Sequence, residues 1–241
     1  MLIAVLTMTL FLLCYAVTRL FFKHTKESGL NLRRAWIKYI AFPLYNIKLE
    51  LEGAPIDEAA LYVCNHRSFM DPVITSKYLD AFIIAKAEIG NYPIINKGAE
   101  ATGVIWVKRE DKGSREGARK AFIDVIKGGH NILVYPEGTV SLTKQTLPFK
   151  KGTFYSAIEE DLPVVPVVLE YRDDKDLWRI FNIVGQYMNQ FGSWRTVVKM
   201  KFGPKMTADD GESLARKCEE WVNTTMMNMH KDWSRMNFEE K

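Results

Sequence analysis

Hydrophobic positions along the chain alternate, from residue 47 onward, between short apolar runs and amphipathic segments. Short apolar runs bounded by turn residues predict strands, here at 47–52, 61–64, 81–85, 103–107, 132–135, 164–169 and 196–202. Apolar residues at helical spacing predict helices at 71–79, 114–127 and 152–160, and a last long helix that begins within 207–210. Residues 90–101 fit either a helix or a loop. Alternating strands and helices predict an α/β domain, a layered mixed β-sheet flanked by helices, without fixing the strand order.

The N-terminus has a different pattern. Residues 1–18 are uncharged and predominantly apolar, and as a helix they would be about 27 Å long, close to the thickness of a bilayer core. Basic residues follow this run instead of preceding it, unlike in a cleaved signal peptide. We therefore expect an uncleaved membrane anchor whose C-terminal side faces the cytoplasm. The alternative is a buried N-terminal helix.

The charge distribution supports an anchor beside anionic lipid. Residues 1–49 contain seven Lys or Arg and a single acid, Glu27, whereas the whole chain has a net charge of only +4. The remainder of the chain is therefore slightly acidic, which argues against a basic nucleic-acid-binding domain. Residues 30–45 mix apolar and basic residues and could form an interfacial helix or an ordinary amphipathic helix packed on the domain. We predict two parts: 1–44, anchor and interfacial helix, and 45–241, the catalytic domain.

Composition narrows the class further. Hydrophobic residues make up 47% of the 241 residues and charged residues 26%, which is typical of a packed globular domain. The three cysteines, Cys14, Cys64 and Cys218, lie far apart without paired spacing, which argues against a disulfide framework or a zinc site. The sequence contains no dinucleotide-binding, Walker, zinc-protease or nucleophile-elbow motif. We therefore expect neither a metal nor a cofactor.

One stretch of candidate chemistry is Asn65-His66-Arg67-Ser68-Phe69-Met70-Asp71-Pro72, directly after the strand at 61–64. Asp71 followed by Pro72 reads as a helix N-cap and first helical residue. His66 would then lie at a strand end and Asp71 at the next helix start, close enough for the carboxylate to hold one imidazole nitrogen protonated. The other nitrogen would be free to act as a base.

Three further blocks follow in order. These are Gly103-Val104-Ile105-Trp106-Val107-Lys108-Arg109, then Tyr135-Pro136-Glu137-Gly138-Thr139, and then Leu162-Pro163-Val164-Val165-Pro166-Val167. The second lies about 70 residues after His66 and also follows an apolar strand. Over residues 45–205, the four blocks resemble the glycerolipid acyltransferase family of the PlsC type, whose best-known members acylate 1-acyl-sn-glycerol-3-phosphate (lysophosphatidic acid).

The resemblance implies a role for each matching residue. His66 would be the general base and Asp71 would orient it. Glu137, Gly138 and Thr139 would help to bind the glycerol-phosphate acceptor. Arg109 would grip the phosphate, and Lys150, in a Phe-Lys-x-Gly run, would be a weaker anion contact. Backbone amides after His66 could stabilise the oxyanion.

Two departures and several alternatives stay open. Val140 stands where phosphatidate-forming members commonly carry Arg, so another lysophospholipid or a lyso-aminolipid is an alternative acceptor. Cys64 lies two residues before His66, which allows a Cys–His acyl-enzyme as a rival mechanism. The expected function is a membrane-bound transfer of an acyl group from acyl-carrier protein or CoA to a lysolipid in phospholipid biosynthesis. A lipid hydrolase and a catalytically silent membrane-binding module are the other classes considered.

Overall fold

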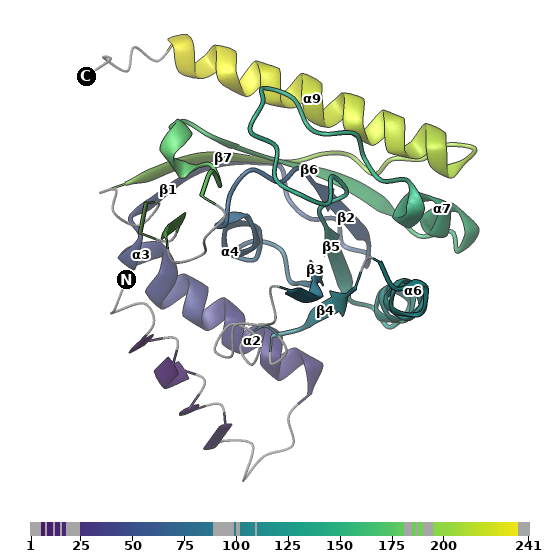
Figure 1. The fold of residues 1–241 in the computed structure, drawn as a ribbon, viewed down its shortest axis with the longest axis horizontal. Coiled ribbons are helices and arrows are strands. Elements are labelled where there is room, and N and C mark those ends of the chain that lie inside the picture. The colour runs from purple at the N-terminus through teal and green to yellow at the C-terminus, as the bar shows by residue number, and fades with distance from the viewer. Residues whose placement is uncertain are drawn as a thin grey trace.

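A computed structural model of the chain describes residues 25–88, 102–108, 110–180 and 195–235, together with runs of two or three residues within 6–17, residue 99, and two pairs within 185–189. A seven-stranded sheet forms its centre, in the order β1-β7-β6-β2-β5-β3-β4 (Figure 1). All neighbouring strands are parallel except β6 and β7, so the sheet is mixed. The strands are β1 Ile47–Glu52, β2 Leu61–Cys64, β3 Ala81–Lys86, β4 Val104–Val107, β5 Asn131–Val134, β6 Val164–Tyr171 and β7 Thr196–Phe202.

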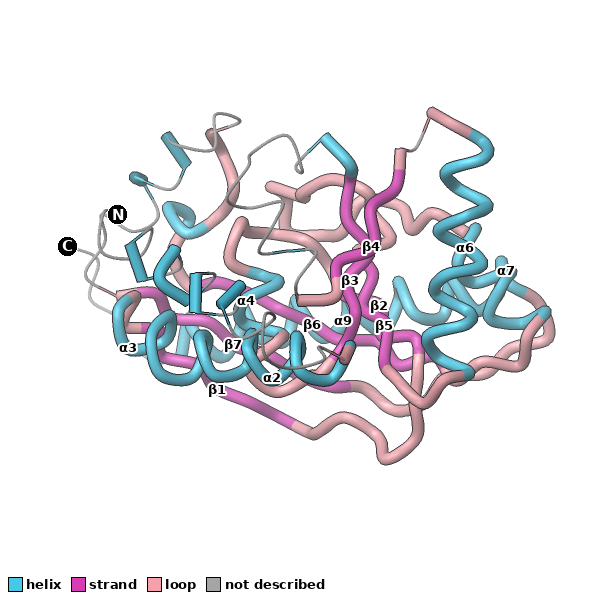
Figure 2. Tube along the Cα trace, turned by 90° about the horizontal axis from the view of Figure 1, so that it is seen from below, coloured by secondary structure: helices cyan, strands magenta, loops and turns pink. Residues whose placement is uncertain are grey.

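Helices cover both faces of this sheet. Figure 1 shows the last helix, α9 (Gly211–Arg235), along one face, with α2 (Lys26–Trp36) and α4 (Asp71–Thr75) on the other. In Figure 2, α6 (Lys112–Lys127) and α7 (Gly152–Glu159) lie together at one end of the molecule, and α3 (Phe42–Leu44) lies towards the other. The short η3 (Asp174–Asp176) follows β6.

Side-chain alternation along the strands divides the core into two clusters. In β2, Leu61 and Val63 join the cluster under α6, α7 and α9, whereas Tyr62 and Cys64 join the cluster under α3 and α4. All four are fully buried, as expected for a strand in the middle of a sheet covered on both faces. The predicted layered α/β fold is therefore confirmed.

Most predicted elements match the observed ones to within one or two residues. The helix predicted at 71–79 is shorter, because α4 ends at Thr75 and gives way to turns. The last helix begins at Gly211, where the Asp210 carboxylate accepts hydrogen bonds from the amides of Glu212 and Ser213. Residues 90–98 lie outside the described residues, as does half of the predicted anchor at 1–18.

The segment at 30–45 packs on the domain. Helix α2 runs through a π-helical turn, η1 (Ile37–Ala41), into α3, and Leu30, Ile37 and Phe42 are buried in the core clusters. This burial favours an amphipathic helix docked on the sheet, although Tyr39 and Leu44 stay exposed. The division of the chain after residue 44 stays a prediction. Among the residues that the structure describes, no helix has both the length and the apolar character that crossing a membrane requires.

Arg33 fixes α2 to the sheet and is not available to lipid headgroups. Its guanidinium is buried and donates to the carbonyl oxygens of Ala81, at 2.6 Å, and Thr102, at 3.1 Å. Burial lowers the pKa of Arg33 to about 10, so it remains charged at neutral pH. The neighbouring Arg34 instead forms an exposed ion pair with Asp80.

These neighbours give a matched test of the docking. Arg33→Met should lower the free energy of unfolding by about 2–4 kcal/mol, because one buried and one partly buried carbonyl lose a charged donor. Arg34→Met should cost less than about 1 kcal/mol, because its ion pair is solvated. Urea unfolding of both variants measures the difference. Equal losses would contradict the assigned role of Arg33.

Candidate functional site

The site forms where β2 and β5 end side by side. The two strands are parallel, with Val63 paired to Val134, so the segments that follow them leave the same edge of the sheet. His66 comes after β2 and Glu137 after β5, and the amide of His66 donates to Glu137 Oε1 at 2.7 Å. Two stretches about 70 residues apart in sequence are thus joined directly.

His66 and Asp71 form a hydrogen-bonded pair. Nδ1 of His66 lies 2.7 Å from Oδ2 of Asp71, and the side chains are 15% and 0% exposed, respectively. A buried carboxylate on Nδ1 favours the tautomer with its proton there. Nε2 is then the nitrogen that a substrate hydroxyl could approach. The predicted closure of the loop onto the imidazole is therefore observed in the geometry.

Asp71 does not cap helix α4 as predicted. Met70 is the N-cap residue, without a side-chain cap bond, and Asp71 and Pro72 are the first two helical residues. The carboxylate instead turns back and accepts the amides of Arg67 and Ser68 on Oδ2, at 2.7 and 2.9 Å. These two amides are consequently engaged with Asp71, and the expectation that they stabilise an oxyanion is wrong for them.

Strand β6 holds the loop from behind. The fully buried side chain of Asn65 donates to the Leu169 carbonyl at 2.7 Å and accepts the Leu169 amide at 2.8 Å, like an extra rung of the sheet. Ser68 Oγ donates to the carbonyl of Asp176, just beyond β6, at 2.6 Å. The loop is therefore fixed at several points along its length.

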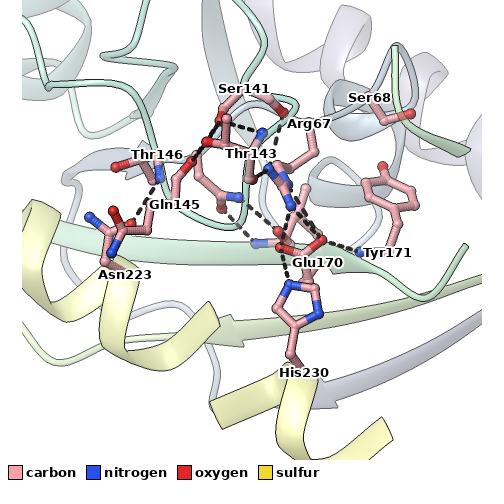
Figure 3. Close-up of polar contacts among 12 residues, drawn as sticks. Arg67, Ser68, Ser141, Thr143, Gln145, Thr146, Glu170, Tyr171, Asn223 and His230 are labelled. Atoms are coloured by element: carbon pink, nitrogen blue, oxygen red, sulfur yellow. Dashed lines mark hydrogen bonds and ion pairs between the residues drawn. The ribbon is translucent and has the colours of Figure 1, made fainter. Parts of the chain in front are cut away.

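A buried ion pair adds to this support. Arg67 and Glu170 are 3% and 1% exposed, and their side chains meet at 3.0 Å. Figure 3 shows Glu170 between Arg67 and His230 of α9, whose Nε2 lies 3.5 Å from Oε2 of Glu170. Arg67 also donates to the carbonyls of Ser141, at 3.1 Å, and Thr143. Arg67 directly follows His66, so these bonds join the histidine loop to the segment that follows Glu137-Gly138-Thr139.

Sequence reasoning did not identify this network. Arg67 reads as an exposed loop charge, and Glu170 is a single acid at the end of an apolar strand. The available signal was that acid itself, since an acidic residue in a buried strand needs a partner. The partner could not be named without knowing which strands are adjacent.

Glu137 also holds the histidine loop, by binding two backbone amides. Its carboxylate is buried, and its oxygens accept the amides of His66 and Leu147, each at 2.7 Å. Burial raises the pKa of Glu137 to about 7, against the two amide bonds, which lower it. With one oxygen committed to each amide, Glu137 is placed to position the histidine loop more directly than to touch a headgroup.

Aromatic rings surround the imidazole. Tyr135 stacks on His66 with 4.4 Å between ring centroids, and Trp178 approaches edge-on at 6.1 Å. Phe69 packs edge-on against Trp178 at 5.4 Å. The electron-rich face of Tyr135 would stabilise an imidazolium ion, and Trp178 and Phe69 add apolar surface beside the histidine.

The other predicted site residues differ in their surroundings. Gly138 has φ +77°, a conformation that favours glycine, which explains its place in the turn after β5. Thr139 and the side chain of Lys150 are exposed, and Val140 is partly buried. Arg109 lies outside the described residues. The structure therefore brings together His66, Asp71 and Glu137.

Cys64 is poorly placed for an acyl-enzyme. It is fully buried in the cluster beneath α4, and burial raises the pKa of its thiol well above the usual range, as do the charges of Asp71 and Glu137 to a smaller extent. A thiol that resists ionisation is a poor nucleophile. Within the described part of the chain, no group of three or more His, Cys, Asp or Glu residues could hold a metal ion.

Comparisons with known proteins agree on one family. The chain is 29% identical over 169 residues to a chloroplastic 1-acyl-sn-glycerol-3-phosphate acyltransferase of Brassica napus, covering 69% of this chain and 49% of that protein. It is 27% identical over 137 residues to a lyso-ornithine lipid O-acyltransferase of Rhodobacter capsulatus, covering 55% and 49%. The chain thus spans about half the length of these curated relatives.

A solved structure shares the fold. The crystal structure of the 1-acyl-sn-glycerophosphate (LPA) acyltransferase PlsC from Thermotoga maritima superposes with a TM-score of 0.66 over 93% of this chain and 95% of that one, at 22% identity. A family model described as Acyltransferase matches residues 46–170, which contain the His66–Asp71 pair and Glu137. On this match over half of its length, the chain belongs to the Acyltransferase family.

Proposed function

We propose that this protein transfers a fatty acyl group from a thioester, carried by acyl-carrier protein or CoA, to the free hydroxyl of a lysolipid. The leading acceptor is 1-acyl-sn-glycerol-3-phosphate, which would give phosphatidic acid. The buried hydrogen bond between His66 and Asp71 is the observation that carries the proposal. The names of the relatives support the acceptor class.

The proposed reaction needs no nucleophile from the protein. With its proton on Nδ1, His66 accepts the hydroxyl proton at Nε2 while the hydroxyl oxygen attacks the thioester carbonyl. The new C–O bond forms, the C–S bond breaks, and the departing thiolate takes the proton from the imidazolium. Asp71 stabilises the imidazolium between these steps, and the Tyr135 face adds to that stabilisation.

Acceptor binding is proposed at the segments around this pair. Thr139 and Lys150 are exposed after β5, and Arg109, at the end of the segment that contains β4, would add a phosphate contact. A lyso-aminolipid is the second candidate acceptor, favoured by Val140 in place of Arg and by the lyso-ornithine lipid relative. The motif residues count against a silent module, and the absence of a nucleophile-elbow motif from the sequence counts against a hydrolase.

We further propose that residues 1–18 anchor the protein in a membrane, with the catalytic domain on the cytoplasmic side. The support is the uncharged apolar run followed by basic residues. Membrane phospholipids would then be partners as well as products.

The histidine is the first test. His66→Ala should lower turnover with labelled acyl thioester and lysolipid by roughly 10²–10⁴-fold, because general-base assistance is lost. The melting temperature should change little. Cys64→Ala is the control and should retain most activity without a trapped acyl-protein. Near-normal turnover of His66→Ala, or an adduct mapped to Cys64, would overturn the mechanism.

Glu137 gives a pH-dependent test. As pH falls through about 7, its proton opposes one of the two amide donors, so the histidine loop loosens and activity falls. Glu137→Gln presents an NH₂ group to one amide at every pH and should lower kcat about tenfold even at pH 8. Its kcat/KM profile should lose the Glu137 contribution. The exposed Glu159→Gln is the control. Wild-type turnover of Glu137→Gln at pH 8 would argue against this role in holding the loop.

Headgroup preference tests Val140. Because Val140 replaces the Arg that phosphatidate-forming members commonly carry, a bound phosphate monoester lacks one charge-assisted contact. Such a contact is worth roughly ten- to a hundredfold in specificity. We expect the wild type to use a lyso-aminolipid or another lysophospholipid comparably with 1-acyl-sn-glycerol-3-phosphate. Val140→Arg should raise relative kcat/KM for the phosphate acceptor across matched acyl chains. A hundredfold wild-type preference for that acceptor would show that Val140 does not set the headgroup.

A further inference from the structure

Three consecutive residues at the end of β6 each hold a different residue of the 65–71 loop. The backbone of Leu169 pairs with the Asn65 side chain, and Glu170 pairs with Arg67. The Tyr171 hydroxyl donates to Oδ1 of Asp71 at 2.6 Å. Figure 3 shows Glu170 and Tyr171 directed differently from the strand, as alternation requires, so one strand supports the loop from both faces of the sheet.

The contact between Tyr171 and Asp71 differs from the others because it reaches the catalytic pair itself. Both residues are buried, at 3% and 0% exposed. Oδ2 of Asp71 is shared by His66 Nδ1 and the amides of Arg67 and Ser68. Oδ1 of Asp71 accepts the hydrogen bond from the Tyr171 hydroxyl. Burial and the Asp71 charge raise the pKa of Tyr171 well above its usual range, so the phenol keeps its proton and remains a donor.

We propose that Tyr171 is a positioning residue that acts through Asp71 to set the basicity of His66. This inference rests on the proposed function. A hydrogen bond from the phenol reduces the negative charge on the Asp71 oxygens, and that charge would otherwise stabilise the imidazolium. It therefore favours neutral His66, which is the form that can accept a proton from the acceptor hydroxyl. It also fixes the rotation of the Asp71 carboxylate, so that Oδ2 stays directed at Nδ1.

Other ionisable groups face this pair and bear on its pH dependence. Cys64 of β2 and Tyr135 after β5 interact electrostatically with Asp71, and burial raises the pKa of each well above its usual range, so both stay neutral. Glu137 faces His66 and has a pKa of about 7. An activity profile near neutral pH therefore contains a Glu137 contribution in addition to any effect on His66. A direct measurement of the His66 titration separates the two.

The experiment removes one hydroxyl. Tyr171→Phe leaves the aromatic ring in the core while Oδ1 of Asp71 loses its donor. The matched control is Tyr62→Phe, because Tyr62 is fully buried in the same core cluster but its hydroxyl accepts the amide of Ile56, at 3.0 Å, and does not contact the pair. Histidine-labelled protein gives the His66 pKa by NMR, with the resonance assigned from His66→Gln. Turnover is measured over the same pH range.

Tyr171→Phe should raise the His66 pKa by about half to one unit and move the ascending limb of kcat/KM to higher pH. Its kcat should fall roughly three- to thirtyfold. Tyr62→Phe should change neither. A His66 titration unchanged in Tyr171→Phe would overturn the inference, whatever the activity. If the His66 pKa differs between Tyr171→Phe and the wild type, but the wild type transfers no acyl group, the coupling is supported and the proposed function is overturned.

Discussion

Everything in the site depends on one carboxylate held away from water. Asp71 is fully buried, and its four hydrogen bonds come from an imidazole, a phenol and two backbone amides. An ionised carboxylate in such a place is tolerated only if its oxygens are satisfied, so the chain must bring all four donors together at once. The tight loop that follows His66 meets part of this need, because its own backbone amides supply two of the four donors. The fourth donor, the phenol of Tyr171, lies about 100 residues later in the sequence, at the end of β6, which pairs with β2.

The same constraint explains a costly feature nearby. A buried ion pair such as Arg67–Glu170 usually gives little net stability, because desolvation offsets the attraction. Here it has a geometric use. The five-donor guanidinium binds Glu170 on β6 and two carbonyls of the segment after β5, at Ser141 and Thr143. One side chain thereby fixes the histidine loop relative to the segment proposed to hold the acceptor. An apolar pair would fill the space without setting that register.

The sequence was sufficient for the elements and the His66–Asp71 pair, and insufficient for what supports them. Apolar runs predict strands because burial is a local property, and the strand ranges agree closely with the structure. His66 and Glu137 follow predicted strands and Asp71 stands at a predicted helix start, and the resemblance to the acyltransferase family gave these three residues their expected roles. The capping role expected of Asp71 was wrong, because a carboxylate at a helix start can turn towards the preceding loop when an imidazole lies there. Tyr171 was not found, since its role depends on strand order, which periodicity does not encode.

Helix α9 extends this support to the outer layer. On its inner face, Glu219 and Asn223 accept the amides of Phe149 and Thr146, and His230 lies against Glu170. The spacing of these three polar residues, four and then seven along the helix, places them on one stripe facing the sheet. The segment between Glu137 and α7 has little regular structure of its own, so its backbone donors need partners from elsewhere. Helix α9 supplies these partners. Residues in the last 25 positions of the described chain thereby help to shape a site whose histidine, His66, lies in the first third of the sequence.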